Sequence, residues 1–187
     1  MGNHFIAGVM VVLIGALSIS ACRSSNNEPT QVSRTTSKTT TGGAESVATG
    51  DPLSQVMVPY EQCHRLLAAD TGDGVQLCAA DVAAAAVAAQ KNGSKATNAH
   101  LSAIEMAARK LSRVPSSDLA ALRLAYGELS RSVVSLVAAT PTAKNNYHVF
   151  ECPMAKGYKR WVQPSGKLVN PYMGTAMLTC GSEVPAQ

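Results

Sequence analysis

Apolar residues recur at intervals of three and four along the middle of the chain, which is the spacing of one buried face of an α-helix. Turn signals such as Thr71-Gly72-Asp73-Gly74 divide this pattern into four segments. The segments run from Leu53 to Ala69, from Val75 to Gln90, from Thr97 to Pro115, and from a cap at Ser116 or Ser117 to Thr140. Amphipathic helices joined by short connections predict an antiparallel up-down bundle over residues 52–140.

The pattern changes in residues 141–187. Residues 147–154 predict a strand, and Pro164-Ser165-Gly166-Lys167 is a turn signal between Trp161-Val162 and Leu168-Val169. The expected fold is mainly α: a four-helix up-down bundle with a small C-terminal β-hairpin cap, packed as one unit with the bundle. An aromatic content of only 4% and abundant alanine favour helix packing over a β-sandwich or barrel.

A third pattern occupies the N-terminus, where an apolar run extends from Phe5 to Ile19. It is shorter than the ~20 residues of a membrane span and has the length of a signal-peptide core. Ile19-Ser20-Ala21-Cys22 follows and resembles the bacterial lipobox, whose cysteine is lipidated. We expect a lipoprotein signal peptide over residues 1–21 and a lipid anchor on Cys22. The alternative is an ordinary secretory signal with a chance cysteine.

Residues 22–51 are rich in Ser, Thr, Asn and Gly and predict a disordered tether. A lipidated Cys22 would place the protein in a bacterial envelope, anchored to the membrane and facing the periplasm or the cell surface. By resemblance to known lipoproteins, Arg23 in place of an aspartate favours the outer membrane.

Charge and motifs exclude several functions. The net charge of +4 is dispersed, without the dense basic stripe of nucleic-acid binders. No Ser-His-Asp order, phosphate-binding glycine loop, zinc-protease motif or Cys-x-x-Cys motif occurs. We therefore expect neither an enzyme nor a nucleic-acid partner.

Sulfur-bearing residues gather in the last forty residues of the chain. Strand alternation would place Cys152 and Met154 on one face. The spacing of Met177 and Cys180, with Met173 four residues earlier, would place those sulfurs on one side of a helical turn. Thiolates and thioethers are the ligands that soft ions such as Cu(I) and Ag(I) prefer. Thioethers also suit an oxidising compartment, because they bind Cu(I) without losing a proton.

Other interpretations of these residues stay open. Cys152 and Cys180 could form a disulfide that staples a cap without a core of its own. Methionines commonly fill cores. His148 shares the predicted face of Cys152 and is either a further ligand or a packed histidine.

The segments Cys152-Pro153-Met154, Asn170-Pro171-Tyr172-Met173-Gly174 and Met177-Leu178-Thr179-Cys180-Gly181, with Trp161 between the first two, resemble a bacterial domain of unknown function. That domain occurs in exported proteins and at the end of some copper/silver efflux adaptor proteins. Residues 53–183 share the resemblance. It implies an extracytoplasmic helical domain with a Cys/Met-rich tail that handles heavy metals, with Cys152, Met154, Met177 and Cys180 as ligands.

Cys63, His64 and Cys78 stand apart from that resemblance. The two cysteines flank the loop at 70–74, so an antiparallel helix pair would hold them at similar heights. They predict a disulfide, with free buried thiols and a second metal site that includes His64 as the alternatives.

Together these observations predict a lipid-anchored, extracytoplasmic protein that binds Cu(I) or Ag(I). It would sequester the ion or pass it to an efflux partner. The alternative is an envelope interaction module that binds no metal and carries a structural Cys152–Cys180 disulfide.

Overall fold

The structure is a computed structural model that describes residues 51–186. The expected signal peptide, the lipidation of Cys22 and the tether, apart from its last residue, lie outside the described residues. Nine elements follow in the described part: α1 (Pro52–Ala68), α2 (Val75–Gln90), α3 (Lys95–Leu111), α4 (Leu119–Ala139), the 3-10 helix η1 (Pro141–Asn145), β1 (His148–Glu151), β2 (Arg160–Gln163), the 3-10 helix η2 (Gly174–Met177) and β3 (Ser182–Glu183).

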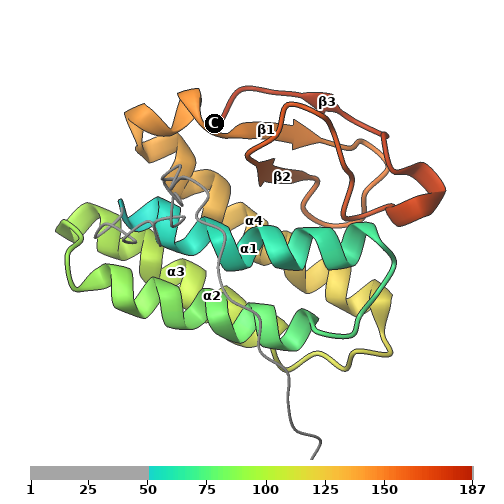
Figure 1. Ribbon diagram of the computed structural model, residues 1–187, viewed down its shortest axis with the longest axis horizontal. Helices are drawn as coiled ribbons and strands as arrows, with labels where there is room; N and C mark the ends of the chain where they lie inside the picture. Colours follow the sequence, from blue (N-terminus) through green and yellow to red (C-terminus); the bar gives the residue numbers. More distant parts are fainter. Residues whose placement is uncertain (1–50, 187) are drawn as a thin grey trace, which may run out of the picture. The chain divides into compact units, whose positions relative to one another are not determined.

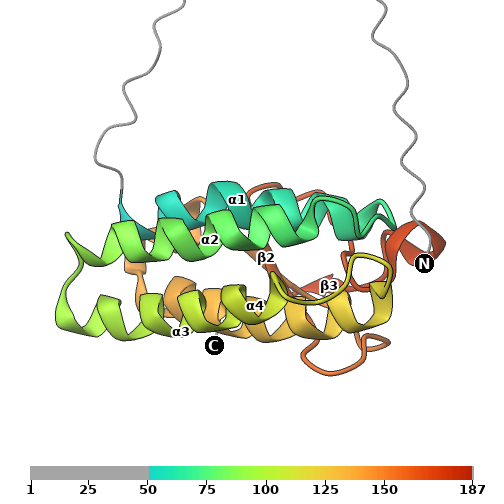
Figure 2. The same cartoon turned by 90° about the horizontal axis from the view of Figure 1, so that it is seen from below.

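The four helices confirm the predicted mainly-α bundle, and each packs along the next one in the sequence. Figures 1 and 2 show α1 and α4 on the side of the strands and α2 and α3 on the far side. The predicted helix ends are close, but one cap is wrong. Asp118, rather than Ser116 or Ser117, caps α4, since its Oδ1 accepts a 2.9 Å hydrogen bond from the Ala121 amide.

The C-terminal region forms a three-stranded antiparallel sheet in the order β2-β1-β3. Phe150 of β1 pairs with Trp161 of β2 on one side and with Glu183 of β3 on the other. The predicted strand over 147–154 is therefore shorter than expected and ends at Glu151.

The hairpin predicted around residues 164–167 is wrong, because β2 pairs with β1 and residues 168–169 form no strand. The buried side chain of Gln163 makes the hydrogen bonds that a second strand of the predicted hairpin would have made. Its Nε2 donates to the carbonyls of Ser165 at 2.6 Å and Lys167 at 2.7 Å, and its Oε1 accepts from the Val169 amide at 3.3 Å. The turn closes on this amide group instead of on a partner strand.

Aromatic side chains join the sheet to the bundle. Tyr60 of α1 stacks on Tyr126 of α4 with ring centroids 5.3 Å apart, and Tyr172 contacts both Tyr126 and the fully buried Trp161. The Tyr60 hydroxyl also accepts a 3.3 Å hydrogen bond from the amide of Val162 in β2. Cap and bundle therefore share one hydrophobic core.

A disulfide joins Cys63 of α1 to Cys78 of α2, with the two Cα atoms 5.6 Å apart. Both residues are buried, so the bridge lies inside the core. None of the helices in residues 51–186 has the length and apolar character that a membrane crossing requires.

Candidate dithiol site

The structure brings Cys152 and Cys180 together, with their Sγ atoms 2.9 Å apart. Both cysteines are free thiols, in contrast to the bridged Cys63–Cys78 pair. Cys152 follows β1 and is fully buried, whereas Cys180 precedes β3 and is partly exposed. The pair thus has one thiol in the core and one that solvent reaches.

Strand pairing sets the position of both cysteines. Glu151 and Ser182 are register partners in β1 and β3, which places Cys152, directly after Glu151, and Cys180, two residues before Ser182, at the same end of the sheet. Gly181, between Cys180 and Ser182, has a φ of 136° and lies so close to the Glu151 carbonyl that a Cβ atom would be 2.7 Å from its oxygen. Only glycine fits this close approach in that conformation.

Asn170 fixes the backbone around Cys180. Its side chain is fully buried, and its Nδ2 donates a 2.6 Å hydrogen bond to the Cys180 carbonyl. Its Oδ1 accepts from the amides of Tyr172 at 2.8 Å and Met173 at 3.1 Å. Its own backbone amide donates to Leu178 at 2.8 Å, so the two ends of the segment 170–180 are held together at one residue.

A polar cluster anchors the middle of the same segment. The Asp70 carboxylate accepts hydrogen bonds from the backbone amide of Thr175, at 2.9 Å, and from the Thr175 hydroxyl. Arg123 Nη2 donates to Asp70 at 2.5 Å, and Arg123 Nε donates to the Pro171 carbonyl at 3.0 Å. The hydrogen bond from the Thr175 hydroxyl, followed by those from Arg123 and the Thr175 amide, lowers the pKa of Asp70 to about 2. The carboxylate is therefore ionised at neutral pH.

The thioethers lie differently from the expectation. Because β1 ends at Glu151, Met154 sits in the turn that follows the strand, and its side chain is 61% exposed. Met177 ends η2 and is 43% exposed. Met173 packs against the core and lines a groove together with Met154. Both predicted thioether ligands are thus on the surface, while Cys152 is inside.

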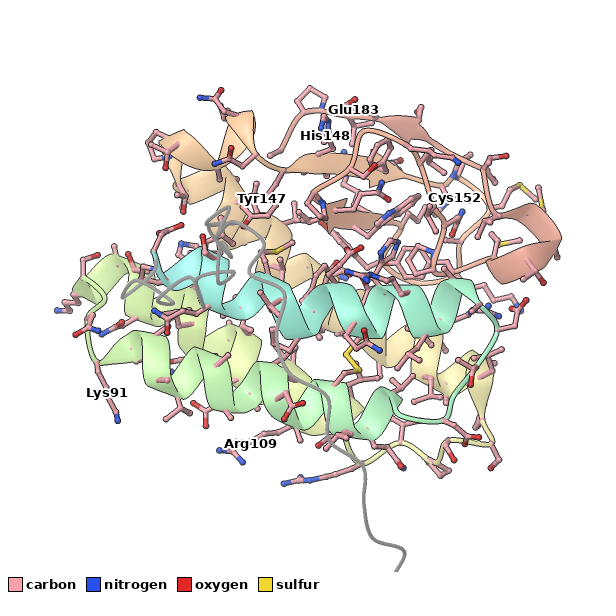
Figure 3. All side chains as sticks on the ribbon, viewed as in Figure 1. Lys91, Arg109, Tyr147, His148, Cys152 and Glu183 are labelled. Carbon is pink, nitrogen blue, oxygen red and sulfur yellow. A yellow bond between two sulfur atoms is a disulfide. The ribbon has the colours of Figure 1, made fainter. Side chains whose placement is uncertain are left out.

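His148 belongs to a different contact. Its Nδ1 lies 2.8 Å from Oε1 of Glu183, and its ring lies 6.2 Å from that of Phe150. Figure 3 shows His148 and Glu183 beside each other and away from Cys152. The structure therefore gives His148 a carboxylate partner across β1 and β3 instead of a place beside the thiols.

The alternative second metal site, with Cys63, His64 and Cys78, does not form in the structure, because the two cysteines are joined in a disulfide. The buried His64 is held by two acceptors. Its Nε2 lies 2.7 Å from the Val169 carbonyl and its Nδ1 lies 3.1 Å from the Glu61 carboxylate. This histidine links α1 to the loop after β2.

The surroundings of Cys180 oppose formation of its thiolate. The hydrogen bond with Cys152, followed by desolvation, raises the pKa of the Cys180 thiol above its ordinary value. Thiol enzymes require the reverse, a pKa lowered by a nearby cation or a helix N-terminus. At neutral pH the Cys180 thiol is protonated, so it would release its proton on binding a metal.

Distance defines what the two sulfurs can do. A tetrahedral zinc ion, with sulfur ligands at about 2.3 Å, holds two of them about 3.8 Å apart, whereas a disulfide holds them about 2.05 Å apart. The observed 2.9 Å lies between these values. Within residues 51–186 no cluster of three or more His, Cys, Asp or Glu side chains could add further ligands. Any additional protein ligand in this part of the chain would therefore come from another kind of group, such as a thioether or a backbone oxygen.

Several residues at this site were not predicted from the sequence. Asp70 and Arg123 carried no expectation as parts of this site. Asp70 contacts the segment that contains Cys180 across 105 residues of sequence and Arg123 does so across 48, and no local pattern marks such contacts. Asp70 also has a φ of 56°, which no local sequence rule required.

No known family, curated protein or solved structure matches the chain. The resemblance noted over residues 53–183 therefore stays a prediction.

Proposed function

We propose that the protein is a lipid-anchored, extracytoplasmic protein that binds Cu(I) or Ag(I) through Cys152 and Cys180 and sequesters the ion or passes it to an efflux partner. The observation that carries the proposal is the meeting of two free thiols, 2.9 Å apart, at the edge of the cap. Its envelope location rests on the sequence of residues 1–22.

The neighbouring residues support this interpretation by elimination. Asn170 holds backbone groups, Gly174 with a φ of 59° leaves room for Asp70, and Gly181 packs against Glu151. These structural tasks account for the polar and glycine positions around the thiols. They leave exposed Met154 and Met177 without a packing task in this region. Thioethers at the surface are suited to capturing a soft ion before it reaches the thiols.

Binding requires a small movement. The two sulfurs must separate by about 1 Å to hold an ion between them. Cys180 is the partner whose side chain can turn, because its thiol is partly exposed although Asn170 holds its backbone. Cys152 is fixed by its burial and by the 3.0 Å hydrogen bond from its amide to the Lys159 carbonyl.

The second candidate function is an envelope interaction module in which Cys152 and Cys180 form a structural disulfide. The specific observation in its favour is the short distance itself, since a closure of about 1 Å would bring the sulfurs to bonding distance. Oxidising compartments promote this bond. The two candidates differ in which state of the pair is functional.

A Cu(I) competition titration tests the proposal. The protein is titrated against a Cu(I) chelator in its dithiol form and after oxidation of Cys152 and Cys180. We expect one equivalent of tight binding to the dithiol form and at least a hundredfold weaker binding after oxidation. Cys63→Ala with Cys78→Ala should bind as the parent protein does, because those sulfurs are outside the site.

Methionine variants refine this test. Met154→Ala with Met177→Ala should weaken Cu(I) binding about tenfold if the thioethers take part. Met106→Ala is the matched control, since Met106 is an exposed methionine on α3 with 68% of its surface accessible. Weak binding to the dithiol form, equal to that of the oxidised form, would favour the interaction module.

A further inference from the structure

A groove of about 510 Å³ lies between the first two turns of α4 and the cap. From α4 it is lined by Leu119 and Leu124, and from the cap by Met154 and Met173. Its wall is therefore largely apolar. A volume of this size lies within the range of small-molecule sites, about 300–1,000 Å³.

The exposed apolar side chains of the groove are not part of the buried core, so packing of the core does not account for them. Leu124 is 47% exposed and lies off the buried stripe of α4 that contains Leu122 and Tyr126. Met154 is 61% exposed on the opposite wall. Isolated exposed residues such as Leu77 need no explanation, but large apolar side chains that meet across a groove mark a binding surface.

The charged groups of the groove have one sign. Arg123 and Lys156 are its charged lining residues, and no carboxylate in the described part of the chain lines it. Arg123 is already paired with Asp70 at 2.5 Å, so Lys156 supplies the charge at the rim. An occupant that complements this surface has an apolar body and an anionic head.

We propose that this groove binds a free fatty acid, with its alkyl chain between Leu124 and Met154 and its carboxylate beside Lys156. The inference goes beyond the proposed metal function and does not rest on it. The affinity rises with chain length, by up to about fourfold for each methylene that the groove buries. It depends on the sign of the head group, because a cationic head faces Lys156 and Arg123.

Calorimetric titration of the full chain tests the proposal, with Cys22→Ser so that the protein carries no acyl group. The probes are octanoate, decanoate and decyltrimethylammonium, each below its micelle concentration. We expect decanoate to bind more tightly than octanoate and at least tenfold more tightly than decyltrimethylammonium. Equal affinity for the anionic and cationic probes would overturn the proposal.

Three variants locate the site. Leu124→Asp should weaken decanoate binding at least tenfold, and Lys156→Glu should weaken decanoate while strengthening decyltrimethylammonium. Leu77→Asp, on the exposed face of α2, is the matched control and should change neither. Thermal melts verify that the variants fold. Unchanged decanoate binding to folded Leu124→Asp would contradict the proposal.

Two further arms separate the alternatives. Binding to phosphatidylglycerol vesicles without binding of soluble decanoate would replace the fatty-acid site with a membrane contact and overturn the proposal. Cys180→Ser should leave decanoate binding unchanged although it removes a metal ligand. The two proposals therefore fail independently.

Discussion

The side-chain amide of Asn170 donates a 2.6 Å hydrogen bond to the backbone carbonyl of Cys180, ten residues further along the chain. This contact closes the segment that carries Met173, Met177 and Cys180 into a loop. The same side chain accepts hydrogen bonds from two backbone amides, so one buried group pairs with backbone polar groups at both ends of the loop. The position of the Cys180 thiol beside Cys152 follows from this arrangement.

Replacing Asn170 should therefore release the loop. Asn170→Ala leaves the Cys180 carbonyl and the amides of Tyr172 and Met173 without their partner, and we expect a loss of about 3 kcal/mol in the free energy of unfolding. Chemical denaturation measures this loss, and the alkylation rate of Cys180 should rise in the folded variant. Asn92→Ala, at an exposed position after α2, is the control and should change neither value. An unchanged alkylation rate in Asn170→Ala would show that another contact positions Cys180.

Asp70 should make the stability depend on acid pH. Its pKa is lowered from 3.8 to about 2 by Thr175 and Arg123, so its contribution is complete above pH 3.8 and is lost as the pH falls through 2. Asp70→Asn removes this charge, and asparagine tolerates the positive φ. We expect a loss of about 1 kcal/mol at neutral pH, because the 35% exposed side chain is screened by solvent.

Unfolding curves between pH 2 and pH 7 measure this dependence. The difference between the parent protein and Asp70→Asn should shrink as the pH falls below 4. Asp81→Asn, on the exposed face of α2, serves as the control and should show no such difference. A difference that stays constant over the whole range would mean that the Asp70 charge does not stabilise the fold.

The Tyr60 hydroxyl should stabilise the fold up to alkaline pH. Burial raises its pKa from 10.0 to about 12, so its stabilising contribution is complete below pH 10 and is lost as the pH rises through 12. Tyr60→Phe removes the 2.7 Å hydrogen bond with Ser130 and the acceptor of the Val162 amide, and we expect a loss of about 2 kcal/mol. Denaturation at neutral pH measures it, with Tyr147→Phe at a half-buried position as the comparison. Equal losses in the two variants would contradict a special role for the Tyr60 hydroxyl.

The Cys63–Cys78 disulfide should contribute mainly to stability. It closes a loop with a sequence separation of 15, for which the loss of unfolded-chain entropy predicts about 3 kcal/mol. Cys63→Ala with Cys78→Ala should therefore lower the free energy of unfolding by this amount. The midpoint of denaturant unfolding should fall accordingly. The helical circular dichroism of the folded variant should stay unchanged. A midpoint equal to that of the parent protein would show that the disulfide adds no stability to a pair of helices already held together by packing.

The helices could be predicted from the sequence because each apolar stripe is local. The pattern from Val75 to Gln90 matches α2 at both ends. The sheet could not be predicted in the same way. The alternation around Trp161 is equally compatible with a local hairpin and with pairing to β1, and the buried Gln163 amide, which replaces the ladder of the hairpin, has no local signature.

The candidate site was predictable in part for the same reason. The sequence led to the expectation that Cys152 and Cys180 share one site, as ligands of the same ion or as a disulfide, and the structure brings the two thiols together. The orientation of Met154 depended on how far β1 extends, and the strand ends before it. Asp70 contacts a residue distant in sequence, and Asn170 contacts the far end of a loop. The spacing of residues along the chain does not predict contacts of either kind.

The most direct test of the account is the protection of the two thiols by Cu(I). The dithiol protein is alkylated with and without one equivalent of Cu(I), and peptide mass spectrometry reports the modification of each cysteine separately. We predict that Cu(I) protects both Cys152 and Cys180, with the greater change at the partly exposed Cys180. Alkylation of Cys180 at the same rate with and without Cu(I) would contradict the proposal that this pair binds the metal.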